Sequence, residues 1–198
     1  MSIKQIQPRF IVLLLFIVAG GILRVTAAGN LTPFSNFSPL GAMALFGGAM
    51  FADKWKSYLF PLLALFFSDV IMMKTVYAAY ADGFLFEGWY WNYIGFAAMV
   101  LIGQLVIRDV KVIPVLGGAV LAAVVYWLIV DFGTWMRPTS IDITTGLPFS
   151  RDFSGLMKCY ALGLPFIKNT LISNVVYCGL FFGLFSWLEN RIPALSAR

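Results

Sequence analysis

Residues 112–136 read VIPVLGGAVLAAVVYWLIVDFGTWM, and this stretch decides the kind of fold that we expect. A helix crosses a bilayer with about 20 apolar residues, and this segment exceeds that length. Its single charged side chain is Asp131. A charge inside a membrane segment is costly unless it is paired or faces a polar cavity. The stretch therefore predicts a transmembrane helix that carries a functional carboxylate.

The composition extends this prediction to the whole chain. Of its 198 residues 61% are hydrophobic and 12% are charged, and the mean hydropathy is +0.87. Such a composition is typical of membrane proteins, so we expect residues 1–198 to form one integral membrane domain. The basic residues are dispersed rather than clustered, so we expect them to orient the protein in the membrane and not to bind nucleic acid.

The residue types also limit the chemistry. There is no histidine, which excludes Ser-His catalysis and His-ligated haem or metal. No G-x-x-x-x-G-K-[ST] phosphate-binding loop is present. We therefore expect a protein that is not an enzyme and holds no cofactor. An intramembrane hydrolase that uses Lys168 with Ser173 or Thr170 is a poor alternative.

Apolar segments predict an all-α membrane protein, a bundle of six transmembrane helices. Their expected bounds are 10–28, 39–52, 58–73, 89–107, 112–136 and 166–188. The first segment also has the pattern of a signal peptide, with basic residues before it and small residues after it. We favour a retained helix.

The distribution of basic residues predicts the orientation. Six crossings put both termini on one side of the membrane. Eight basic residues lie on that side: Lys4, Arg9, Lys54, Lys56, Arg108, Lys111, Arg191 and Arg198. The opposite loops contain Lys74, Arg137, Arg151 and Lys158. Cytoplasmic loops carry the excess of Lys and Arg, so we expect both termini in the cytoplasm.

Four charged side chains lie within the apolar segments, namely Arg24, Asp69, Asp131 and Lys168. In the expected topology each lies within about one turn of the outer end of its helix. We expect them to form the substrate-binding floor of a pocket that opens outward. The structural alternative is two ion pairs that fix helix registers without touching a ligand.

The second segment is too short to cross a bilayer by itself. Residues 29–38 must supply the missing length, and irregular backbone at membrane depth is tolerated only beside protein or a water-filled cavity. We therefore expect this stretch to dip in from outside and to place Asn36 in the pocket.

Small residues recur every four positions in three helices: Ala44, Gly48 and Ala52; Gly118 and Ala122; Gly179 and Gly183. This spacing lets helices approach closely, either within the chain or against a partner membrane subunit. The outer loops are rich in aromatic residues, which fit either an interfacial belt or the walls of a ligand site.

Four motifs carry a family resemblance: residues 36–49 (NFSPLGAMALFGGA), 60–69 (FPLLALFFSD), 131–135 (DFGTW) and 155–169 (GLMKCYALGLPFIKN). With them the chain resembles small bacterial membrane proteins related to the substrate-binding (S) components of energy-coupling factor transporters. The resemblance covers nearly the whole chain. It adds Trp135 and Asn169, which end two of the motifs, to the candidate substrate-binding residues.

The resemblance implies a six-helix bundle in the bacterial inner membrane that captures a vitamin or metal ion from outside. The implied partners are a small-molecule substrate, membrane lipid, and a membrane scaffold with two ATPase subunits. One departure concerns the first helix, where Ala19 is followed four residues later by Leu23 instead of alanine. A solitary transporter is therefore an alternative to one that shares an energising module.

The long outer loops could enclose a large ligand, and we hypothesise uptake of a vitamin-like micronutrient, with cobalamin as the leading guess. Cys159 is a weak candidate metal ligand, because thiolates favour soft or borderline metals. The alternative function is an accessory or assembly subunit of a larger membrane complex that binds no transport ligand.

Overall fold

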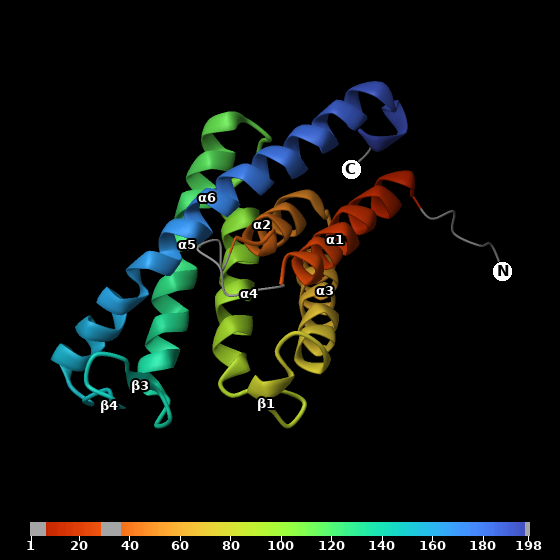
Figure 1. Cartoon of the computed structure of the whole chain (residues 1–198). Helices are drawn as coiled ribbons and strands as arrows, with labels where there is room; N and C mark the ends of the chain where they lie inside the picture. The colour runs from red at the N-terminus through yellow and green to blue at the C-terminus, as the bar shows by residue number, and fades with distance from the viewer. Residues whose placement is uncertain (1–6, 29–36, 197–198) are drawn as a thin grey trace.

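The computed structural model describes residues 7–28 and 37–196, and in them the chain is mostly helical (Figure 1). The α-helices are α1 (Pro8–Ala27), α2 (Leu40–Met50), α3 (Lys54–Lys74), α4 (Trp89–Val106), α5 (Val112–Met136) and α6 (Phe153–Arg191). The six predicted helices are thus confirmed as helices, and the bounds of α5 match the prediction. Asn36 and most of the expected dipping segment lie outside the described residues.

The start of α6 was predicted wrongly. The helix begins at Phe153, not at residue 166, and continues through Pro165 to Arg191. Asp152 caps it, since its carboxylate accepts a hydrogen bond from the Gly155 N–H. Proline removes one backbone hydrogen bond from a helix interior, but neighbouring helices can hold such a helix together in a membrane protein.

Helix α2 lies at the centre of the described helices. Its residues from Gly41 to Gly48 are buried, and it contacts all five other helices. The Phe46 ring packs against aromatic rings of α1 and α6, among them Phe16 and Phe181. A Cβ at Gly48 would lie 2.2 Å from the Val100 carbonyl oxygen of α4, so glycine is required for this approach. The small residues of α2 therefore serve packing within the chain.

Two short antiparallel hairpins close one end of the molecule, which we call the hairpin end (Figure 1). The first pairs β1 (Ala81–Asp82) with β2 (Leu85–Phe86), after a 3-10 turn at Ala78–Tyr80. The second pairs β3 (Ile141–Asp142) with β4 (Leu147–Pro148).

The opposite end joins the first and last helices, with a second 3-10 turn at Pro193–Leu195. The buried Arg9 of α1 forms an ion pair with Glu189 of α6 at 2.8 Å. It also donates to the Leu195 carbonyl, and its guanidinium lies over the Phe185 ring. This cluster fixes α1 against the end of α6.

Four helices are long and apolar enough to cross a membrane: α1, α3, α5 and α6. Helix α2 is apolar but shorter. Large apolar side chains are exposed on these helices, such as Leu15, Phe67 and Ile113. Exposed apolar faces on long helices are what a lipid environment requires, so the fold is that of a helical membrane protein.

Candidate functional site

Arg24 and Asp69 form a buried ion pair between α1 and α3. Arg24 Nη2 lies 2.6 Å from Asp69 Oδ1, and only 1% of the Asp69 side chain is exposed. Arg24 Nη1 also donates to Ser68 Oγ at 2.6 Å, and this hydroxyl donates to the Leu65 carbonyl. Two of the four predicted charges therefore neutralise each other inside the molecule.

Two tyrosines connect this ion pair to α4 and α5. The Tyr93 hydroxyl faces the Asp69 carboxylate, within electrostatic range of Arg24. The Tyr126 hydroxyl lies within electrostatic range of Arg24, Asp69 and Asp131. Three of the four predicted charges thus lie within electrostatic range of one hydroxyl, that of Tyr126.

Asp131 is half-buried and faces α6. A Cβ at Gly163 would lie 1.7 Å from Asp131 Oδ2 and 2.8 Å from Trp127 Nε1, so α6 reaches these groups only because residue 163 is glycine. Cys159 Sγ donates to the Asp131 carbonyl at 3.4 Å. Among the described residues Asp131 forms no ion pair.

Lys168 does not lie where we expected it. The prediction put it in the first turn of its helix, but α6 begins 15 residues earlier, at Phe153. Along α6 it lies between Gly163, which faces Asp131, and Asn174, which donates to the Ala119 carbonyl. It is therefore level with the middle of α5. Its side chain is exposed and makes no ion pair in the part of the chain that the structure describes. The second ion pair of the structural alternative is thus absent there.

Among the described residues, the predicted Trp135, Asn169 and Cys159 are not members of the Arg24–Asp69 ion pair. Trp135 donates its indole N–H to the Ser150 carbonyl at 2.8 Å, and its ring stacks under Arg151, so it holds the connection between α5 and α6. Asn169 is half-buried on α6. Cys159 is buried, and no group of three His, Cys, Asp or Glu side chains that could hold a metal occurs within residues 7–28 and 37–196.

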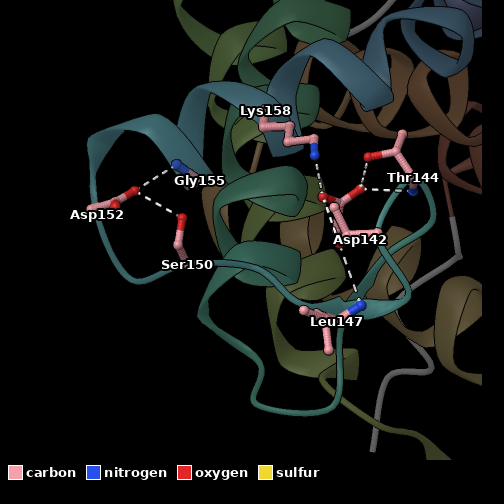
Figure 2. A network of polar contacts seen from close by, with 8 residues as sticks. Asp142, Thr144, Leu147, Ser150, Asp152, Gly155 and Lys158 are labelled. Carbon is pink, nitrogen blue, oxygen red and sulfur yellow. Dashed lines mark hydrogen bonds and ion pairs between the residues drawn. The ribbon is translucent and has the colours of Figure 1, made fainter.

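A polar network fixes the connection between α5 and α6 (Figure 2). Asp142 forms an ion pair with Lys158 and accepts hydrogen bonds from the backbone and hydroxyl of Thr144. The ion pair with Lys158 lowers the pKa of Asp142 well below its ordinary value. The Gly155 N–H similarly lowers the pKa of Asp152. Asp142 therefore holds β3 against α6 through Lys158, and Asp152 caps the start of that helix.

A cavity of about 210 Å³ with a mixed polar and apolar lining lies between the start of α4 and the end of α5, at the hairpin end, and we call it the polar cavity after its charged and amide side chains. Its lining residues are Phe86, Glu87, Gly88, Trp91, Asn92, Val130, Gly133, Thr134 and Arg137. Sequence reasoning counted Phe86 and Trp91 among the aromatic residues that fit either an interfacial belt or the walls of a ligand site, and it named none of the other lining residues as a site residue. Glu87 and Arg137 lie outside the apolar segments, where charged residues are common and do not indicate a site. Asn92 lies within a run of aromatic residues that begins at Trp89, so its polar side chain was not singled out.

Asn92 joins the cavity to the polar region around the ion pair. The Tyr126 hydroxyl donates to Asn92 Oδ1 at 3.2 Å. The same hydroxyl lies within electrostatic range of Arg24, Asp69 and Asp131. None of the four predicted charges lines the cavity.

The fold and the buried ion pair define the class as a helical membrane protein with a polar interior. The chain belongs to a family of unknown function, DUF6580, whose model matches residues 4–195. No curated protein and no solved structure gives a significant match.

Proposed function

We propose that the chain is a substrate-capture component of a bacterial inner-membrane transport system. It crosses the membrane six times, with both termini in the cytoplasm, and binds a small micronutrient from the outer side without chemical change. The observation that carries this proposal is the polar cavity at the hairpin end. Its lining residue Asn92 accepts a hydrogen bond from Tyr126, and the Tyr126 hydroxyl lies within electrostatic range of the Arg24–Asp69 pair. Polar groups kept inside a membrane bundle commonly mark a substrate path.

The size of the cavity favours a small ligand. At about 210 Å³ it is below the range of roughly 300–1,000 Å³ that is typical of sites for drug-sized molecules. A corrinoid is much larger and requires α4 and α5 to separate at this end. We therefore favour a smaller polar nutrient as the ligand. Cobalamin is tested beside it.

The resemblance to S components suggests partners for transport, a membrane scaffold with ATPase subunits. A second candidate function, an accessory subunit without a ligand, rests on Gly179 and Gly183 of α6. A Cβ at either position would meet nothing within 4 Å, so these two small residues are free for another helix.

The experiment is native mass spectrometry of the full-length protein, purified in lipid nanodiscs, with identification of small molecules that survive purification. Isothermal titration against a micronutrient panel that includes corrinoids follows. We expect a retained molecule that fits the cavity and rebinds after removal. A protein that retains nothing, binds nothing in the panel and purifies with a stoichiometric protein partner would establish the accessory subunit instead.

A further inference from the structure

The polar cavity is lined by one cationic and one anionic side chain that do not pair with each other. Arg137 Nη1 donates to the backbone carbonyl of Glu87 at 2.8 Å, and the Glu87 carboxylate accepts from the Thr139 hydroxyl at 2.6 Å. Between the two charged groups no ion pair forms. Both line the cavity, so it presents opposite charges at separate points of its wall.

The cationic part of the wall is rich in donors. Arg137 has five N–H groups, and the Glu87 carbonyl takes a bond from one of its nitrogens. Asn92 Oδ1 is occupied by the Tyr126 hydroxyl, so its amide nitrogen has two donors left for the cavity. A guanidinium together with an amide NH₂ is complementary to a carboxylate.

The anionic part of the wall can accept a cation. The Thr139 hydroxyl uses one site on Glu87 Oε2, and a carboxylate has about four acceptor sites. The remaining sites suit an ammonium group. The other lining side chains are mainly apolar or aromatic, with Phe86, Trp91 and Val130 among them, and they suit a short apolar side chain of the ligand.

We propose that this cavity binds a small zwitterion, a free amino acid or a molecule with the same pair of amino and carboxylate groups. Arg137 and Asn92 receive the carboxylate, and Glu87 receives the ammonium. The volume of about 210 Å³ suits one molecule of that size. This inference rests on the proposed function and names the class of its substrate.

The test uses the full-length protein in nanodiscs and the twenty standard amino acids, each titrated into the millimolar range. Binding is followed by Trp fluorescence, to which Trp91 contributes, and by the shift in thermal unfolding. The best binder is compared with two analogues, one that lacks the amino group and one that lacks the carboxylate. We expect saturable binding of at least one amino acid and affinities about tenfold lower for both analogues.

Variants test which group of the ligand each charged side chain binds. We expect Arg137→Gln and Glu87→Gln each to weaken amino-acid binding about tenfold. Arg137→Gln should not change the affinity for the analogue that lacks the carboxylate. Glu87→Gln should not change the affinity for the analogue that lacks the amino group. Asn92→Asp keeps the acceptor for Tyr126 but adds a negative charge beside the carboxylate, so it should also weaken binding. Arg151→Gln is the matched control, because Arg151 is exposed and does not line the cavity.

The inference is overturned if no amino acid binds, if either analogue binds as tightly as the amino acid, or if all three cavity variants bind like the wild type. Two other results distinguish failure of the zwitterion site from failure of the proposed transport function. A retained ligand without the amino and carboxylate pair overturns the zwitterion and supports the transport role. Amino-acid binding by a protein that moves no amino acid in cells supports the site and overturns that role.

Discussion

The Arg24–Asp69 pair combines nearly complete burial of Asp69 with close contact between opposite charges. Moving two charges out of water costs about as much as their attraction returns, so the intact pair adds little stability by itself. Loss of one partner is different, because the other charge then stays buried without compensation. The pair therefore makes the association of α1 with α3 depend on both residues.

We expect Arg24→Met and Asp69→Leu each to lower the free energy of unfolding by about 3–5 kcal/mol. The double variant should recover most of this loss, since it leaves no charge behind. The measurement is reversible unfolding of the purified protein in detergent micelles, arranged as a double-mutant cycle. Lys74→Met is the control, because Lys74 is exposed at the end of α3. Additive losses in the double variant would show that the two charges do not act as a pair.

At the scale of elements, sequence reasoning worked where apolar length decides the outcome. The 112–136 segment forms a helix with these same bounds, because its run of apolar residues is flanked by charged or polar residues. The predicted start of α6 was wrong, because Gly155 and Pro165 were assigned to the connection before the helix. Local propensity disfavours both in a helix, but the cap at Asp152 and the packing of α6 on α5 outweigh it.

The candidate site could be predicted in part for the same reason. Charges within apolar segments are visible in the sequence, and two of them, Arg24 and Asp69, form an ion pair in the structure. Which of them pair depends on helix rotation and register, which composition does not specify. The cavity depends on two segment ends, at Gly88 and Arg137, and their proximity arises only from the packing of α4 against α5.

The packing of α6 on α5 gives a matched pair of glycine substitutions. In Gly163→Ala the new Cβ collides with the Asp131 carboxylate and the Trp127 indole nitrogen, so we expect a loss of about 1–3 kcal/mol in the free energy of unfolding. In Gly179→Ala the Cβ meets nothing within 4 Å, so stability should stay the same or rise slightly, since alanine is the better helix former. Unfolding of both variants in detergent checks this. Equal effects would mean that α6 does not pack on Asp131 as described.

At the scale of the whole molecule, the proposed orientation can be tested on the two ends of the bundle. Asp82 of β1 lies at the hairpin end, and the exposed Asp109 lies in the opposite turn, between α4 and α5. Helix α4 separates them and is not among the four helices that are long and apolar enough to cross a membrane. A single cysteine at each position therefore tests the orientation and the crossing by α4 together.

Cysteines at 82 and 109 are introduced one at a time into a background with Cys159→Ser and Cys178→Ala, and intact cells are treated with a membrane-impermeant maleimide. We expect Asp82→Cys to be labelled in intact cells and Asp109→Cys only after permeabilisation, because the positive-inside rule puts Arg108 and Lys111 in the cytoplasm. Asp53→Cys, between α2 and α3, should behave like Asp109→Cys, since α3 also separates it from the hairpin end. The reverse pattern would place the polar cavity in the cytoplasm and end the proposal of uptake. Labelling of both Asp82→Cys and Asp109→Cys in intact cells would show that α4 does not cross the membrane.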